Sequence, residues 1–495
     1  MSKEIILSRF KKKPRVVLLA ALLVCSLGIF TPAKAQQDSL FVLPDSSNAF
    51  TLENFYALIL RNHPVVRQIN LLSDIAKQEI RLARGNFDPK IEFQYQQKNF
   101  NNTEYYELLK GGVKFPSVLP FDPKVGVERN QGQYLNPENY IANDFNYQQF
   151  YAGVSMPLGQ GLITDERRVA LKQAELFSEL TEAEQVKLTN KLLLDAAKDY
   201  WQWYYAYYNF RIQNRGVNIA SEIFKRVKLT AQQGEASVID TVQAQITLQE
   251  RLIQQQEALL DFQNSGVVLS TYLWDSVGTP LALTLNWAPV RDTEYWAVSE
   301  GELLELKEQA KENHPELQKL SVKLQQLELD RKLAKEFLKP KLDVSYTFLN
   351  QPFDPEWNYG MAIGENYKFG LDFAFPLLIR KERSKLEQTK IKLSSTRFEQ
   401  NIAERQVLNQ IDVSFNTLVN TRNVINQLSA MVSNYERMLQ AEFLNLENGE
   451  SDLFKINVQQ DKLIQAQTKY LKMLSEFEKN RALLYWAAGV RNLGE

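Results

Sequence analysis

Two stretches of sequence decide the fold of this chain: Pro89-Lys90-Ile91-Glu92-Phe93-Gln94-Tyr95 and, 251 residues later, Pro340-Lys341-Leu342-Asp343-Val344-Ser345-Tyr346. The tripeptide Asn62-His63-Pro64 returns at the same offset as Asn313-His314-Pro315. A repeat of this length is far longer than the unit of about 20–50 residues found in solenoid proteins. The chain is therefore predicted to consist of two similar halves.

A second offset reveals a length difference between the halves. The dipeptide Gly234-Glu235 returns as Gly449-Glu450 at an offset of 215. Because the two offsets differ by 36, the first half must hold extra residues between Tyr95 and Gly234. We expect these residues in a long polar loop at about 100–144, whose counterpart in the second half spans only 350–366. Long loops of this kind are typical of the extracellular side of outer-membrane barrels.

Residues 1–35 are predicted to be a secretory signal peptide. Four basic residues at 11–15 precede the apolar run 16–30, and Ala33-Lys34-Ala35 offers a cleavage site. Cys25 lacks the small preceding residues of a lipobox, so lipidation is not expected. Removing this segment takes away seven basic residues and one acidic residue, which changes the formal net charge from −1 to −7 and leaves no cysteine. An exported, acidic, cysteine-free chain argues against a disulfide scaffold and against nucleic acid as a partner.

Two unusually long helices are predicted. From about 166 to 233 there is no proline and only one glycine, Gly216, and from about 381 to 448 there is neither. Each run would extend roughly 100 Å as one helix. A second segment with apolar residues at a spacing of three to four follows each run, as in a coiled-coil seam. We therefore expect helical hairpins at about 165–274 and 381–488, turning at Gly234 and Gly449.

Strands are expected between the helices, at about 89–157 and 340–376. Apolar residues alternate with polar ones from Ile91 and again from Leu342, and each half shows two such strands. Shorter helices at about Val65–Gly85 and Glu302–Phe337 precede the strands. Four strands per chain are too few to close a barrel, which needs about eight. Since no segment after the signal peptide is a candidate transmembrane helix, strands spanning a membrane would have to come from several chains.

The residues at the hairpin turns resemble those of the TolC family of bacterial outer-membrane efflux channels, the outer-membrane factors. The family pattern is glycine, a small hydroxyl residue, aspartate and then Ala-Gln, and the first half has Gly234, Ser237, Asp240 and Ala244-Gln245. The second half matches less closely, since Asp452 and Lys455 stand where serine and aspartate would. A further family element, Gly-x-x-x-Pro-Leu followed by basic residues, occurs at 153–158 with Arg167-Arg168.

The resemblance implies a mainly α fold with a small β part, built from duplicated helix-strand-strand-helix halves. The domains would be the signal peptide at 1–35, a first repeat at 36–274, a connection at 275–300 and a second repeat at 301–495. Three chains would share a 12-stranded barrel in the outer membrane, and their hairpins would form a periplasmic α-barrel. Such a channel passively exports solutes that an inner-membrane transporter and a periplasmic adaptor deliver. The sequence does not identify the exported solute. The alternative function is a periplasmic coiled-coil adaptor or scaffold without a pore.

The resemblance also implies two sets of functional residues. The turns would form the periplasmic tip that meets the adaptor, with the residues Gly234, Glu235, Ser237, Gly449, Glu450 and Ser451. Asp240 matches an aspartate of the family's closed tunnel mouth, and its repeat partner Lys455 suggests an Asp240–Lys455 latch. The acidic ring of the family is expected to be missing, because Val458 occupies its position.

Other conspicuous residues are interpreted structurally. His63 and His314 lack neighbouring ligands at metal spacing, so they are expected to start helices rather than to bind a metal. The aromatic run Tyr200–Tyr208 is expected to pack the long helix against outer helices. No phosphate loop, nucleophile elbow or His/Asp/Cys constellation is present, so neither an enzyme nor a cofactor is predicted.

Overall fold

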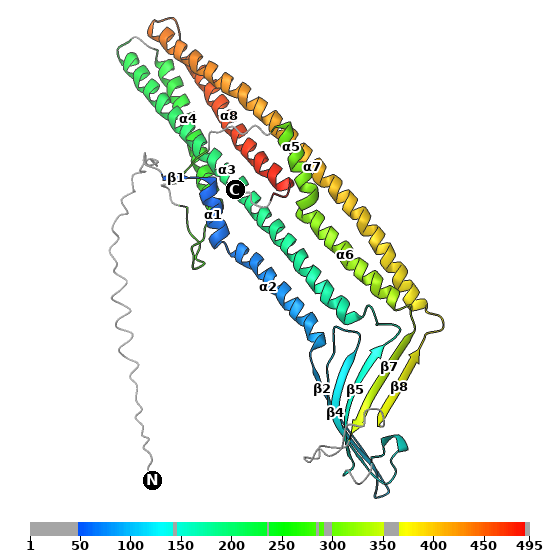
Figure 1. Cartoon of the computed structure of the whole chain (residues 1–495). Helices are drawn as coiled ribbons and strands as arrows, with labels where there is room; N and C mark the ends of the chain where they lie inside the picture. Colours follow the sequence, from blue (N-terminus) through cyan, green and yellow to red (C-terminus); the bar gives the residue numbers. More distant parts are fainter. Residues whose placement is uncertain are drawn as a thin grey trace, which may run out of the picture. The chain divides into compact units, whose positions relative to one another are not determined.

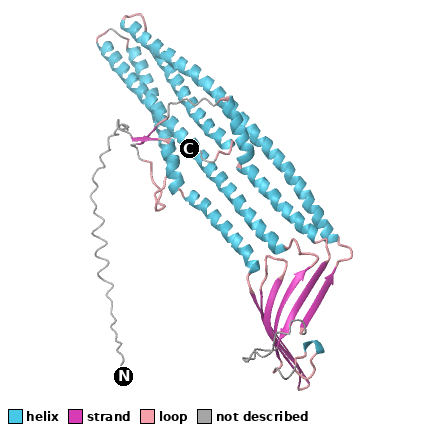
Figure 2. Ribbon diagram, viewed as in Figure 1, coloured by secondary structure: helices cyan, strands magenta, loops and turns pink. Residues whose placement is uncertain are grey.

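The computed structural model describes residues 48–141, 146–234, 237–283, 287–291, 299–350 and 366–490 (Figure 1). The predicted signal peptide at 1–35 lies outside these residues. The helices and strands follow in two similar series (Figure 2). The first series is β1 Asn48–Phe50, α1 Leu52–Asn62, α2 Pro64–Arg84, β2 Lys90–Phe100, β3 Thr103–Lys114, β4 Asp122–Gln131, β5 Gln148–Pro157, α3 Glu166–Gln232 and α4 Val238–Ser270. The second series is β6 Trp287–Pro289, α5 Glu300–Asn313, α6 Pro315–Glu336, β7 Lys341–Asn350, β8 Tyr367–Ala374, α7 Arg380–Glu447 and α8 Leu453–Ala487.

In each half, the Asn-His-Pro tripeptide ends one short helix and begins the next. The Nδ1 atoms of His63 and His314 each accept a hydrogen bond from a backbone N–H two residues later, at 3.2 Å. Pro64 and Pro315 take the first helical position, where the missing N–H costs nothing. The predicted role of both histidines as helix-start residues is confirmed.

The prediction of a single helix at Glu302–Phe337 was wrong. The chain forms α5 and α6 instead, because Pro315 cannot continue a helix and the His314 side chain caps a new one. The same break separates α1 from α2, and α1 was not predicted. Thr51 and Ser299 cap the first helix of each pair. Each side-chain oxygen accepts a hydrogen bond, at 3.2 Å, from the backbone N–H three residues later.

The long helices are confirmed. Helix α3 has 67 residues and α7 has 68, and each turns back into a second helix, α4 or α8. We call α3 with α4 the first hairpin and α7 with α8 the second hairpin. Near the turns, one hydrophobic cluster joins all four helices through the buried residues Ile223, Val227, Ala244, Leu439 and Ile456.

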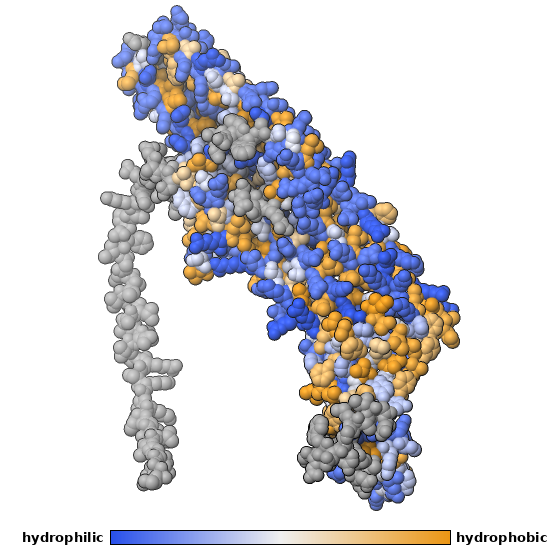
Figure 3. Space-filling view, in the orientation of Figure 1, coloured by the Kyte–Doolittle hydropathy of each residue, from blue (hydrophilic) through white to orange (hydrophobic). Residues whose placement is uncertain are grey.

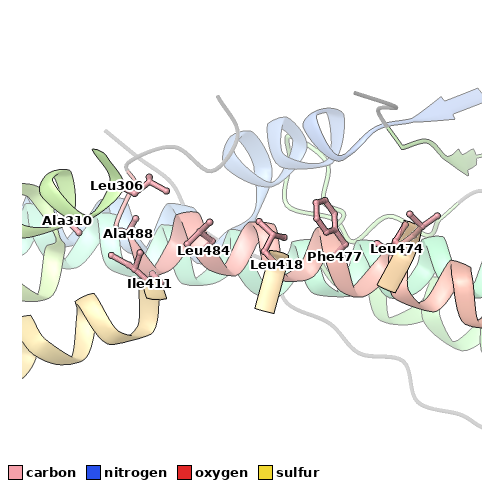
Figure 4. Packing of buried hydrophobic residues seen from close by; sticks show 10 residues of the cluster. Leu306, Ala310, Ile411, Leu418, Leu474, Phe477, Leu484 and Ala488 are labelled. Carbon is pink, nitrogen blue, oxygen red and sulfur yellow. The ribbon is translucent and has the colours of Figure 1, made fainter. Parts of the chain in front are cut away.

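A second cluster holds the far part of α8 between α5 and α7. Its labelled members in Figure 4 include Leu306 and Ala310 of α5, Ile411 of α7 and Leu484 of α8. All four are buried, and Ala310, Ile411 and Leu484 are fully so. Helix α5 lies against α7, and its side chains share this cluster with α8, so it extends the packed core of the second half.

The aromatic run of α3 packs as expected. Trp203 is fully buried, and the Tyr200 hydroxyl donates to the carbonyl oxygen of Phe50 at 2.7 Å. Phe50 of β1 stacks on Trp287 of β6, with ring centroids 4.4 Å apart, and β1 and β6 pair in parallel. Burial raises the pKa of Tyr200 well above its ordinary value, so its hydroxyl stays a donor. The run therefore holds β1 and β6 against α3.

Apart from β1 and β6, the described strands form one antiparallel sheet in the order β2-β3-β4-β5-β7-β8. The strands expected from Ile91 and Leu342 are confirmed as β2 and β7, and the second strand expected in each half is confirmed as β5 or β8. The expectation of four strands per chain was wrong, because the sheet has six. The supposed loop at about 100–144 contains β3 and β4.

Candidate channel sheet and hairpin turns

The sheet has one apolar and one polar face. Successive strand residues point to opposite faces, and paired residues on neighbouring strands share a face, so the register assigns each side chain. The apolar face consists of Ile91, Phe93, Tyr95, Leu109, Val113, Val125, Val127, Ala152, Val154, Met156, Leu342, Val344, Tyr346, Phe348, Tyr367, Phe369, Leu371 and Phe373. The polar face carries Lys90, Glu92, Gln94, Lys110, Lys114, Asp122, Lys124, Glu128, Gln149, Ser155, Asp343, Ser345, Thr347, Lys368 and Asp372. Such a sheet can separate lipid from water.

Much of the apolar face is open to the surroundings of the single chain. On the two outermost strands, Ile91 of β2 is 86% exposed and Phe373 of β8 is 67% exposed. Figure 3 shows hydrophobic side chains gathered over the strands next to the helices. A surface of this kind on a folded protein marks a contact with lipid or with another chain.

The two hairpin turns have matching geometry. Gly234 and Gly449 have φ angles of +82° and +76°, which side chains other than glycine rarely adopt. The N–H of Glu450 donates to the Asn445 carbonyl oxygen at 2.8 Å, and the N–H of Gly449 donates to that of Leu446. These bonds satisfy carbonyl groups at the end of α7, as expected for a helix that ends in glycine. Glu235 lies outside the described residues.

The remaining predicted site residues start the returning helices. Ser237 caps α4, and Asp240 accepts from the Ser237 N–H at 3.2 Å, which completes a capping box. In the second half the cap is Asp452, which accepts from the Lys455 N–H at 2.9 Å. Ser451 donates instead to the Glu442 carboxylate. Asp240 therefore has a local structural partner, while the Lys455 side chain is exposed.

The structure adds polar contacts between the hairpins that sequence reasoning missed. Arg251 of α4 is buried and pairs with Asp461 of α8. Farther toward the turns, the Asn457 amide donates to the Thr247 hydroxyl at 3.3 Å. The buried Gln460 amide approaches the Gly216 carbonyl oxygen, and the missing side chain of Gly216 leaves room for Ile464. No spacing pattern in the sequence links Arg251 to Asp461.

Among the described residues, no group of three or more His, Cys, Asp and Glu side chains is arranged to hold a metal ion. None of the described helices is both long and apolar enough to cross a membrane.

Residues 306–490 match the model of the outer membrane efflux protein family. The fold is similar to that of the outer-membrane channel OprN, with a TM-score of 0.62, 14% identity and coverage of 90% of this chain and 91% of that chain. It is also similar to the Campylobacter jejuni CmeC outer membrane channel (TM-score 0.60, 12% identity, 88% and 85% coverage) and to the open state of the Neisseria gonorrhoeae MtrE outer membrane channel (0.61, 12%, 88% and 88%). No match was found among curated protein sequences.

The family match and the shared fold confirm the resemblance to the TolC family of outer-membrane efflux proteins that the turn motifs indicated. The OprN, CmeC and MtrE structures are all described as outer-membrane channels, which agrees with the predicted location in the outer membrane.

Proposed function

We propose that this protein is a homotrimeric outer-membrane channel that passively exports solutes. One observation carries the proposal: a sheet with an apolar and a polar face is joined directly to two helical hairpins whose longest helices extend roughly 100 Å. The apolar face would meet outer-membrane lipid, and the polar face would meet a water-filled lumen. The hairpins would continue that lumen through the periplasm.

Open surfaces of the single chain support a trimer. The sheet ends in two edge strands, β2 and β8, whose outer backbone groups would be costly to leave unpaired inside a membrane. Pairing β8 of one copy with β2 of the next removes both edges. Apolar side chains also remain exposed along α4 and α7, for example Ile253 and Ile402. Neighbouring copies would cover these side chains.

Ion conductance tests the channel. The purified mature protein is reconstituted into planar lipid bilayers, and its oligomeric state is checked beforehand by native mass spectrometry. We expect discrete conductance steps from the trimer. A correctly assembled trimer that inserts into the bilayer without conducting would overturn the proposal and favour a scaffold.

The turns are proposed to bind a periplasmic adaptor that works with an inner-membrane transporter. Glu450 of one turn and Glu235 of the other would pair with basic adaptor residues, a contact that favours specificity more than affinity. Charge reversal at both positions should weaken adaptor binding in a pull-down experiment. Glu257→Lys, on the exposed surface of α4 away from the turn, is the matched control. Equal binding by the double variant and the control would refute the contact.

Asp240 and Lys455 are proposed to form a latch at the periplasmic mouth. An exposed pair of this kind usually contributes under about 1 kcal/mol. Asp240→Ala also removes the capping box, so Asp240→Asn and Lys455→Ala are compared with it. We expect each of the three variants to raise channel conductance. Conductance that changes only with Asp240→Ala would assign the effect to helix capping.

A further inference from the structure

We propose that β3 and β4 form an additional membrane-crossing hairpin, so that each chain gives six strands to the shared barrel. The inference rests on the proposed trimeric channel. A trimer would then have three times six, or eighteen, strands in place of the twelve that the family resemblance implied. The hairpin would also contribute its own side chains to the lumen.

The length and position of the hairpin fit a membrane crossing. Strand β3 has 12 residues and β4 has 10, whereas a transmembrane strand needs about 9–11. Lys114, at the end of β3, pairs with Lys90 at the start of β2. Asp122, at the start of β4, pairs with Ser155 near the end of β5. The hairpin therefore reaches the same edge of the sheet at which β2 and β5 meet the helices.

The side chains of the hairpin match the faces of its neighbours. Val113 and Val125 lie in one row of the apolar face, between Ile91 of β2 and Ala152 of β5. A one-residue slip would move every side chain of the hairpin to the opposite face. The exceptions on the apolar face, Glu107, Arg129 and Gln131, lie at the ends farthest from the helices. Polar residues there fit the boundary between lipid and water.

The polar face of the hairpin carries ion pairs between β3 and β4. Lys110 of β3 lies 3.5 Å from Glu128 of β4, and Lys114 lies 3.6 Å from Asp122. Asp122 also accepts a hydrogen bond from Arg167 at the start of α3, at 3.2 Å. The two lysine side chains are 49% and 39% exposed and their carboxylate partners 17% and 16%, and these four residues lie on the same face as Glu92 and Lys368. They belong in a hydrated lumen, because charged groups facing lipid are costly.

Tyr151 fastens the hairpin to the rest of the sheet. Its ring reaches from β5 across Gly126 of β4 to Gly112 of β3, and a side chain at either glycine would overlap the ring. The Lys110 ammonium lies 4.7 Å from the centre of the same ring. Tyr151 is 6% exposed although it belongs to the polar face. This packing across three strands indicates that the hairpin is an ordered part of the sheet rather than a surface loop.

Paired cysteines on β4 test the proposal. The chain has one cysteine, Cys25, in the predicted signal peptide, so each introduced thiol is unique in the mature protein. Val127→Cys and Glu128→Cys are adjacent residues on opposite faces. Each is labelled with an environment-sensitive fluorophore in trimers within vesicles. We expect brominated lipid to quench the Val127→Cys label several-fold more than the Glu128→Cys label, and a charged thiol reagent at Glu128→Cys to lower conductance.

The same pair of measurements on β7 separates this inference from the channel proposal. Val344→Cys and Ser345→Cys lie on opposite faces of a strand that any barrel from this chain would contain. If brominated lipid does not quench the Val344→Cys label more than the Ser345→Cys label, the channel proposal itself is contradicted. A β7 pair that behaves as expected, with both β4 labels in water, would overturn only the six-strand barrel. Val113→Cys and Lys114→Cys on β3 replace the β4 pair if those variants do not assemble.

Electron cryomicroscopy of the trimer in lipid nanodiscs counts the strands directly. Eighteen strands in one closed wall would support the proposal, and twelve strands with the hairpin folded elsewhere would overturn it. Because barrel diameter grows roughly linearly with strand number, the closed wall should be about 1.5 times as wide as a 12-stranded one of the same tilt. The outer-membrane lumen would then admit bulkier solutes.

Discussion

The helices of the two halves agree closely, whereas their strands do not. Helices α3 and α7 differ by one residue in length, and α4 and α8 differ by two. The first half nevertheless has four strands in the sheet and the second half has two. In the proposed tunnel α3 and α7 would stand side by side, so their lengths must match. A sheet can accept a whole extra hairpin without changing the direction in which the chain returns to the helices.

The largest expected effect comes from placing a charge on the apolar face. Val344→Arg on β7 should cost about 2–4 kcal/mol per chain if this face meets the membrane interior. The neighbouring Ser345→Arg points to the polar face and should be tolerated. Trimer yield from vesicles, measured after folding under identical conditions, compares the two variants. Equal yields would contradict the separation of the faces in the second half.

A smaller effect is expected from replacing Gly126, which packs against the Tyr151 ring. Gly126→Ala would overlap the Gly111 carbonyl oxygen and the Tyr151 ring, and overpacking of this kind costs about 1–3 kcal/mol. Gly370→Ala on β8 is the matched change in the second half, where the new methyl group would meet only the Ser345 hydroxyl, which can rotate away. The thermal midpoint of the barrel should fall clearly only for Gly126→Ala. A similar fall for both would show that Tyr151 is not the cause.

The turns should respond alike in both halves. Gly234→Ala and Gly449→Ala each force alanine into a left-handed conformation, at a cost of about 1 kcal/mol. Neither new methyl group meets a neighbouring atom, so the cost is conformational. Circular dichroism of the helices during thermal unfolding measures it. Clearly unequal losses would show that the two turns differ in the assembled protein.

The smallest expected effect is a dependence on pH through the paired histidines. Burial lowers the pKa of His63 and His314 below the ordinary value of 6.5, and each neutral Nδ1 accepts a capping hydrogen bond. The unfolded chain therefore binds protons more readily, so this part of the stability is present above about pH 6.5 and is lost as pH falls below it.

The double variant His63→Asn/His314→Asn tests this dependence, because asparagine can still cap a helix but does not titrate. Between pH 8 and pH 5 its helix-unfolding midpoint should shift less than that of the unchanged protein. Identical shifts would assign the pH dependence to other groups.

Much of the helical architecture could be predicted from sequence. The absence of proline over about 67 residues predicted α3 and α7, and the glycines predicted both turns. The hairpin of β3 and β4 was missed, because its glycines, proline and polar residues are typical of a loop. Its signals were weak: Asn101 and Asn102 adopt positive φ in a tight turn, and Val125 and Val127 alternate with polar residues.

The sequence by itself determined the duplication, the long hairpins and the family resemblance, because helix period, helix breakers and repeat offsets are properties of neighbours along the chain. Only the tertiary structure decided the number of strands, the partners of Tyr151 and the contact of Arg251 with Asp461. These features depend on residues far apart in sequence, and pairing across a sheet or between hairpins has no local signature. The 36 residues that distinguish the halves were visible from the offsets, but register and packing decided that most of them are strand.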